Sequence, residues 1–159
     1  MRVLRVSLIA SMIGFFLLPE AWSTDVRIPS QPVVVNSHHS FPETINKLKA
    51  AVKKRNLMII FELKHKEVMA MTGFKGKNLA TIGFVGREME YDILRVEPRA
   101  ALEMPLRIAV LELDNGTVDV VYYQASYLFK HYENKDLDKL HRGIDVLVGS
   151  IIKEAAASN

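Results

Sequence analysis

The tripeptide Asp114-Asn115-Gly116 constrains the fold of this chain more than any other feature, because it stands between two β-rich segments. Those segments span residues 106–113 and 117–123, and alternation in the second predicts one core face and one more exposed face. Asn-Gly between two such segments is the strongest short-range signal for a hairpin. The sequence therefore predicts a local antiparallel pair of strands.

Two amphipathic helices are predicted, one before and one after this hairpin in the sequence. The first covers residues 41–55, where apolar residues recur along one helix face, and Ser40 with Glu43 forms the pattern of a capping box. The second covers residues 135–157 and carries a continuous apolar face. Each helix therefore has one face that must be buried against another element.

The remaining segments complete the expected fold class. Three have the composition of strands, residues 33–38, 57–63 and 79–85. The nearly unbroken apolar run of residues 57–63 predicts a central, well-buried strand. Short helices are expected over residues 65–72, 87–96 and 125–132. This order predicts an α+β fold of two layers, with the helices packed on one face of a mixed, largely antiparallel sheet.

The N-terminus has the pattern of a secretory signal peptide. Arg2 and Arg5 flank the start of an apolar run from Val6 to Leu18, and small residues precede an expected cleavage site after Ser23. The run is shorter than the ~20 residues that a spanning helix needs, so we expect no membrane span after cleavage. The expected location is the periplasm or the extracellular side, where nucleic acid is not an expected partner. The expected organisation is a signal peptide (1–23), a flexible leader (24–32) and a single domain (33–157).

Charge is divided unevenly along the chain. Residues 44–79 contain nine Lys and Arg against Glu62 and Glu67, which is 9 − 2 = +7. Residues 80–119 contain four Arg against eight acidic residues, which is 4 − 8 = −4. Such a division is compatible with docking of two protomers, with steering of a small anionic ligand, or with two solvated faces. A homodimer and a small anion are the partners that this pattern allows.

Residues 97–128 resemble the family catalogued as "domain of unknown function 302". The resemblance covers about residues 33–152 and is carried by Pro98, Ala101, Met104-Pro105-Leu106-Arg107, the Asn-Gly hairpin, Tyr123 and Tyr127-Leu128, with Ser40-Phe41 and Phe61 to His65 upstream. The chain departs from the family at Gly86-Arg87-Glu88 and at Gln124-Ala125-Ser126, where the family often has Gly-Asn-Pro and Asn-Asp-Pro. The resemblance implies a compact α+β domain that self-associates, and it implies no particular reaction.

Several kinds of chemistry are excluded by missing motifs. The chain has no cysteine, which excludes disulfides, cysteine nucleophiles and covalent c-type heme attachment. The glycines do not have the spacing of a phosphate-binding loop, and neither a Gly-x-Ser-x-Gly nor a His-Glu-x-x-His motif is present. The sequence therefore contains no standard enzyme signature.

His65 is the strongest candidate for a site residue, because it follows the apolar segment 57–63 directly. If residues 65–72 are helical, Met69 lies one turn away on the same face. Imidazole and thioether together suit Cu(I) or the axial positions of a non-covalent heme. Copper needs a third ligand from elsewhere, such as His38, His39 or Met58. The alternative is that Met69 fills the core and His65 forms a local hydrogen bond.

Arg107 and Tyr123 complete the candidate ligand-binding residues. Arg107 is expected either to clamp an anion or to pair with a carboxylate, namely Glu97, Glu103 or Asp119. Tyr123 is expected either to hydrogen-bond a ligand or to pack. The leading hypothesis is an exported, non-enzymatic, dimeric module with a small-ligand cleft near His65. The alternatives are a copper or heme carrier using His65 and Met69, and an enzyme with His65 as general acid or base.

Overall fold

The computed structural model describes residues 32–158, which form one five-stranded sheet flanked by helices. The predicted signal peptide, and the predicted leader up to residue 31, lie outside the described residues. The order across the sheet is β1-β5-β4-β3-β2, and every neighbouring pair is antiparallel. The strands are β1 (Val33–Ser37), β2 (Met58–Lys64), β3 (Leu79–Val85), β4 (Leu106–Glu112) and β5 (Val118–Tyr122).

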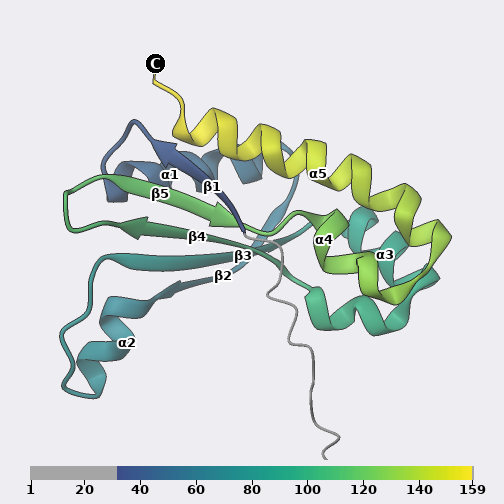
Figure 1. Ribbon diagram of the computed structural model, residues 1–159, viewed down its shortest axis with the longest axis horizontal. Helices are drawn as coiled ribbons and strands as arrows, with labels where there is room; N and C mark the ends of the chain where they lie inside the picture. Colours follow the sequence, from purple (N-terminus) through teal and green to yellow (C-terminus); the bar gives the residue numbers. More distant parts are fainter. Residues whose placement is uncertain (1–31, 159) are drawn as a thin grey trace, which may run out of the picture.

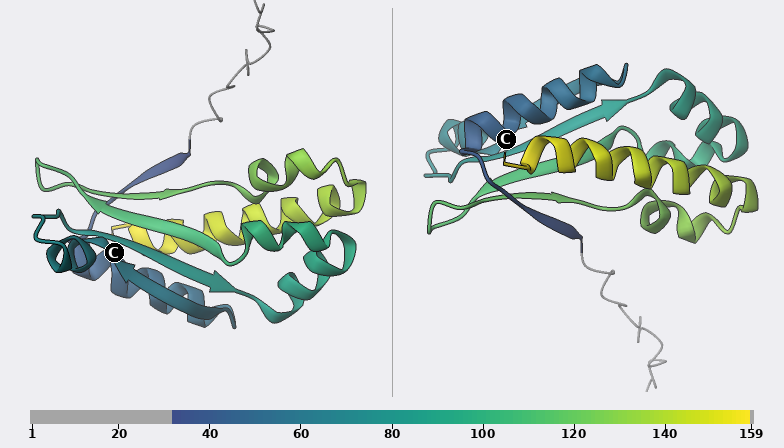
Figure 2. Two further views of the ribbon diagram at one scale, coloured as in Figure 1. Left: turned by 90° about the horizontal axis from the view of Figure 1, so that it is seen from below. Right: turned by 90° about the horizontal axis from the view of Figure 1, so that it is seen from above.

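The two long helices lie on one face of this sheet. The helix α1 (Phe41–Lys54) connects the two edge strands β1 and β2, and α5 (Lys135–Ala156) ends the domain. They contact each other, and Figure 2 shows them side by side over the sheet in its right-hand view. The shorter helical segments are α2 (His65–Met71), α3 (Arg87–Val96), η1 (Pro98–Glu103), α4 (Ala125–Phe129) and η2 (Lys130–Tyr132).

The hydrophobic core lies between this helical layer and the sheet. Leu48 and Val52 on α1 and Ile151 on α5 are fully buried, as are Ile82 and Ile108 in the interior strands β3 and β4. The apolar stripe of each helix packs against the side chains that point inward from every second strand residue, and this burial stabilises both helices. The α+β fold with helices on one face is therefore confirmed, and the sheet is more regular than the mixed sheet expected.

The predicted hairpin is confirmed, and the predicted capping box is wrong in detail. The turn between β4 and β5 places Gly116 at φ +81°, a value that favours glycine. At α1, Ser40 is the N-cap residue, but its side chain makes no capping hydrogen bond. Glu43 contacts His39 Nδ1 at 3.2 Å, so its carboxylate serves a neighbouring side chain.

The largest correction concerns β2, which was expected to be central and well buried. It is an edge strand, and four of its apolar side chains, Met58, Ile60, Phe61 and Leu63, are exposed. Its pairing with β3 shifts register between Ile59 and Phe61, which is the irregularity of a β-bulge. The apolar run therefore supplies both faces of an edge strand, and one of these faces has no helix over it.

Figure 1 shows where the connections of the sheet lead. The segment after β2 forms α2 and projects from the body of the domain, while α3, α4 and η1 gather at the other end of the sheet. Within the part of the chain that the structure describes, none of the helices is long and apolar enough to cross a membrane.

Candidate functional site: the open face of the sheet

The face of the sheet opposite α1 and α5 is uncovered, and we call it the open face (Figure 2, left). Strand register aligns one residue from each strand into a row across its middle. The row consists of Leu63, Thr81, Ala109, Val121 and Val34. Four of its five members are apolar, whereas a solvent-facing side of an antiparallel sheet is ordinarily polar.

Two members of this row show how accessible it is. Val34 is 55% exposed and Leu63 is 42% exposed, and they belong to the two edge strands. An apolar surface that crosses a whole sheet is unusual for a monomer and is typical of a surface that binds another molecule. The open face is therefore the best candidate for a functional surface.

Gly83 shapes the open face beside this row. Its partner across the β2–β3 pair is Phe61, whose ring lies over the glycine. A Cβ at Gly83 would stand 2.6 Å from Phe61 Cζ, so a larger residue would displace the ring. Glycine at this position allows the aromatic ring to lie flat against the sheet.

His65 contacts the open face from the first residue of α2. Its Nε2 lies 2.8 Å from Thr81 Oγ1, in the middle row, and the imidazole is half-buried. This is a local hydrogen bond between the end of one strand and its neighbour. It fixes the direction of the ring and leaves Nδ1 as the second polar atom of the side chain.

Arg107 and Tyr123 lie at the other end of the open face. Arg107 stands opposite Gly83, and Tyr123 follows Tyr122, which pairs with Ile108. Since successive strand residues alternate between faces, Arg107 and Tyr123 are neighbours on the same side.

Aromatic and charged groups surround this pair. The ring of Tyr123 stacks on that of Tyr127 with centroids 5.1 Å apart, and Lys130 Nζ lies 4.1 Å from the Tyr127 centroid. Arg107 Nη2 is 4.0 Å from Glu103 Oε2, which is a loose ion pair. Of the three carboxylates considered for Arg107, the structure selects Glu103.

The three predicted ligand-binding residues thus share one face but do not meet in one cleft. A cleft of about 440 Å³ lies beside β2, but it is lined by Lys49, Glu62 and Lys64 on the side that carries α1. Lys49 Nζ and Glu62 Oε2 form an ion pair at 2.6 Å across it. His65 points to the opposite face, toward Thr81.

The residues proposed as metal ligands have separate surroundings. His39 Nε2 lies 2.7 Å from the carbonyl oxygen of Ala157, and its Nδ1 contacts Glu43. Met69 packs against Gly76, because a Cβ there would stand 2.9 Å from the thioether sulfur. Among residues 32–158, no group of three or more His, Asp and Glu side chains could hold a metal ion. His39 and Met69 thus have partners other than His65, and the copper or heme alternative stays a prediction.

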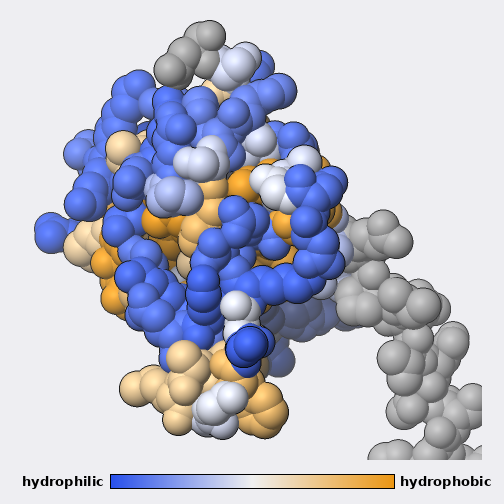
Figure 3. Space-filling model, turned by 90° about the vertical axis from the view of Figure 1, so that its left-hand side faces the viewer, coloured by the Kyte–Doolittle hydropathy of each residue, from blue (hydrophilic) through white to orange (hydrophobic). Residues whose placement is uncertain are grey.

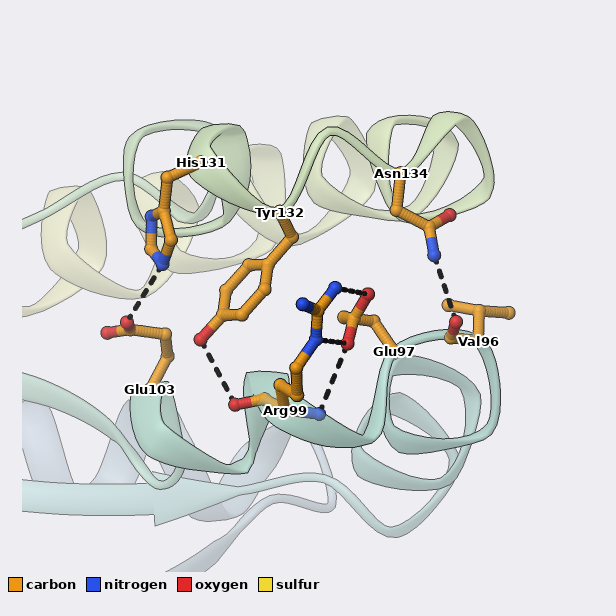
Figure 4. Close-up of polar contacts among 7 residues, drawn as sticks. All are labelled: Val96, Glu97, Arg99, Glu103, His131, Tyr132 and Asn134. Atoms are coloured by element: carbon orange, nitrogen blue, oxygen red, sulfur yellow. Dashed lines mark hydrogen bonds and ion pairs between the residues drawn. The ribbon is translucent and has the colours of Figure 1, made fainter.

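A polar cluster that sequence reasoning missed joins η1 to the start of α5 (Figure 4). Glu97 is only 6% exposed and accepts hydrogen bonds from Arg99 Nε at 2.7 Å and Nη2 at 2.9 Å. The Arg99 hydrogen bonds are the main reason why the pKa of Glu97 falls to about 2. Tyr132 donates to the carbonyl of Arg99 at 3.1 Å, and Asn134 donates to the carbonyl of Val96 at 2.9 Å.

These contacts give the cluster a structural role. They hold the segment before β4 against the segment before α5, and so they position the end of the open face that carries Arg107. A sequence signal existed for one member, because Asn134 stands immediately before the predicted helix 135–157 and is a favoured N-cap residue. The pairing of Glu97 with Arg99 across Pro98 had no comparable signal.

The domain is thus of the α+β class, with a five-stranded antiparallel sheet, helices on one face and an apolar open face opposite them. The family described as domain of unknown function DUF302 matches residues 33–155, and the chain therefore belongs to this family.

A solved structure with the same fold is the crystal structure of the uncharacterized conserved protein DUF302 from Bacillus stearothermophilus. It aligns with a TM-score of 0.73 and 13% identity, over 78% of this chain and 97% of that chain. At this identity the likeness shows the fold alone. No match was found among curated proteins.

Proposed function

We propose that this domain is an exported, non-enzymatic binding module that pairs with a second copy through the open face and binds a small anionic ligand there. The observation that carries the proposal is the uncovered apolar row from Leu63 to Val34. Export rests on the N-terminal sequence pattern, and the expected compartment is the periplasm or the extracellular side.

The size of the open face suits a second copy. Five strands spaced ~4.8 Å apart, with residues rising ~3.4 Å each, give a face of roughly 500 Å² in projection. The accessible area of this face is larger than its projection, because side chains stand out from it. It approaches the ~800 Å² that each partner contributes to a standard interface. Two sheets packed in this way would form a sandwich with a shared apolar centre.

The distribution of side chains also suits a symmetric pair. In an isologous dimer the same patch is used on both copies. A two-fold axis lying between the sheets and parallel to the strands would set the β2 edge of one copy over the β1 edge of the other. Leu63 would then face Val34 at both edges, and His65 would approach Asp119, which shares its end of the open face.

The ligand is proposed to bind at the Arg107 end of this face. The guanidinium of Arg107 is half-exposed, and its only close carboxylate among the described contacts stands at 4.0 Å, so its donors remain accessible to an anion. Tyr123 lies beside it with its ring fixed by the stack on Tyr127. A planar anion would find donors from Arg107 and a ring surface from Tyr123. Dimerisation would close the second side of this site.

The dimer is tested by native mass spectrometry and light scattering of the purified protein. Val121→Asp places a charge in the middle of the open face, and Val146→Asp is the matched control, because Val146 is exposed on α5. We expect a dimer for the unmodified protein and for Val146→Asp, and a monomer for Val121→Asp with an unchanged far-UV spectrum. A monomeric unmodified protein at micromolar concentration contradicts the proposal.

The ligand is tested by calorimetry with a series of small carboxylates and phosphates. Arg107→Gln should abolish binding while leaving the native mass unchanged. The same preparation tests the carrier alternative through its absorption spectrum and metal content. Colourless, metal-free protein that takes up neither copper nor hemin excludes that alternative.

A further inference from the structure

The segment between β2 and β3, residues 65–78, projects from the domain and is called here the α2 arm (Figure 1). Every residue of α2 is exposed or half-buried. At the tip of the arm, Met71 is 87% exposed and Phe74 is 71% exposed. Two large apolar side chains, three positions apart in the sequence, are therefore exposed to solvent away from the row across the open face.

This exposure is built into the backbone of the arm. Gly73 takes φ +80°, and the amide of Phe74 donates to the carbonyl of Met69 at 3.0 Å, which closes the end of the helix. The loop then returns along α2, where a Cβ at Gly76 would stand 3.0 Å from Lys66 Cα. Lys66 Nζ donates to Asn78 Oδ1 at 3.2 Å and ties the two limbs together. The arm thus holds its apolar tip outward in a defined conformation.

The arm, with Lys64 before it, carries more lysines than acidic residues, and two of these lysines form ion pairs, Lys64 with Glu67 and Lys77 with Asp114. The sequence from Lys64 to Asn78 contains four lysines against Glu67, which is 4 − 1 = +3. Two of the lysines, Lys75 and Lys77, lie within three residues after Phe74 in the loop and are exposed. Figure 3 shows apolar side chains gathered at the lower end of the molecule, over α2, beneath a band of hydrophilic residues.

We infer that the α2 arm docks on an anionic phospholipid surface. Met and Phe side chains partition into the boundary between headgroups and acyl chains, and lysines above them pair with lipid phosphates. Lysine side chains suit this arrangement, because their methylene stems lie along apolar groups while the ammonium reaches the headgroups. A second copy would offer the arm little negative charge on its open face. In the rows of strand residues that pass through Gly83, Thr81 and Leu79 on that face, Asp119 is the only carboxylate. The inference does not depend on the proposed ligand.

The test is cosedimentation of the purified protein with vesicles of phosphatidylcholine alone and of phosphatidylcholine mixed with phosphatidylglycerol. We expect binding to the mixed vesicles, little binding to the neutral ones, and weakening as salt rises, because salt screens the lysines. All variants share the N-terminus of the parent protein, so differences between them report the arm alone.

Two pairs of variants separate the apolar and the charged contributions. Met71→Ser combined with Phe74→Ser should weaken binding by at least about tenfold, and Leu102→Ser with Val146→Ser is the control at exposed positions outside the arm. Lys75→Ala should weaken binding by about fivefold, and Lys77→Ala should weaken it less, because Lys77 is paired with Asp114. Circular dichroism and melting temperature check that each variant is folded.

Three outcomes overturn the inference. The first is equal binding to neutral and anionic vesicles, and the second is tip variants that bind as the parent protein does. The third is a tip variant that changes the native mass while the parent protein binds no vesicles, because the arm would then be a contact between proteins.

Discussion

Asn134 offers a quantitative test of how the polar cluster supports the fold. Its Oδ1 accepts from the amides of Asp136 at 3.0 Å and Leu137 at 3.3 Å, which caps α5. Its Nδ2 donates to the carbonyl of Val96 at 2.9 Å, which ties the end of α3 to the start of α5. One side chain therefore serves two separable purposes, since an acceptor makes the cap and a donor makes the tie.

Two substitutions separate these contributions. Asn134→Ala removes both, and the loss of an N-cap costs ~1 kcal/mol while the loss of the tie costs ~1 kcal/mol. The total of about 2 kcal/mol corresponds to a fall in Tm of roughly 6–10 °C for a domain of this size. Asn134→Ser keeps an acceptor for the cap but is too short to reach Val96, so it should cost about half as much.

The measurement is urea unfolding followed by far-UV circular dichroism, because Trp22 is the only tryptophan and lies before the expected cleavage site. The unfolding slope should stay constant, so that midpoints compare stabilities directly. Equal losses for the Ala and Ser variants would refute the contribution of the cap. A Ser variant as stable as the parent protein would refute the contribution of the tie.

Three further predictions concern other parts of the domain. Glu97→Gln should be less stable than the parent protein above pH 4.5, because the folded state lowers the pKa of Glu97 to about 2. The difference in unfolding free energy between the two proteins should shrink as the pH falls from 4.5 toward 2, where the carboxylate of the parent protein is protonated. Parallel curves of stability against pH would contradict this. Gly76→Ala should increase amide hydrogen exchange within the α2 arm with little change in Tm, because the new Cβ would crowd Met69 and the backbone of the arm. Unchanged exchange would show that the close approach of the loop to α2 does not stabilise the arm. Thr44→Val should cost ~1–2 kcal/mol in urea unfolding, because Thr44 is fully buried and its hydroxyl lies 2.7 Å from that of Ser37, whereas a neutral effect would mean that the buried pair contributes nothing.

The site could be predicted only in part, and the three candidate residues show why. Strand ends and residue chemistry predict His65, Arg107 and Tyr123 as site residues, and the structure places all three on one face. Glu103 is one of the three carboxylates that the sequence offers Arg107, and only the structure selects it. Tyr127 lies four residues after Tyr123, and their stacking depends on how α4 follows β5. The hydrogen bond of His65 with Thr81 was not predictable, because it joins two segments that the sequence alone does not align. The polar cluster of Glu97 and Asn134 was missed for the same reason, since 37 residues, 134 − 97, separate them.

The sequence by itself determined the local elements. The hairpin at Gly116, the apolar stripes of α1 and α5 and the short α2 ending before Gly73 all follow from turn chemistry and periodicity, which depend on neighbours in the chain. The family membership could also be anticipated, because its pattern lies in the order of these elements.

Only the tertiary structure decided which surfaces remain uncovered. The apolar run of β2 looks the same in sequence whether two layers cover it or one, and burial is a property of the whole fold. The helix α1 connects the two edge strands β1 and β2, so that β2 lies at an edge of the sheet. The second long helix, α5, packs beside α1 on the same face. With both long helices on one face, the other face of the sheet and the α2 arm remain exposed. These are the two surfaces on which the proposed functions rest.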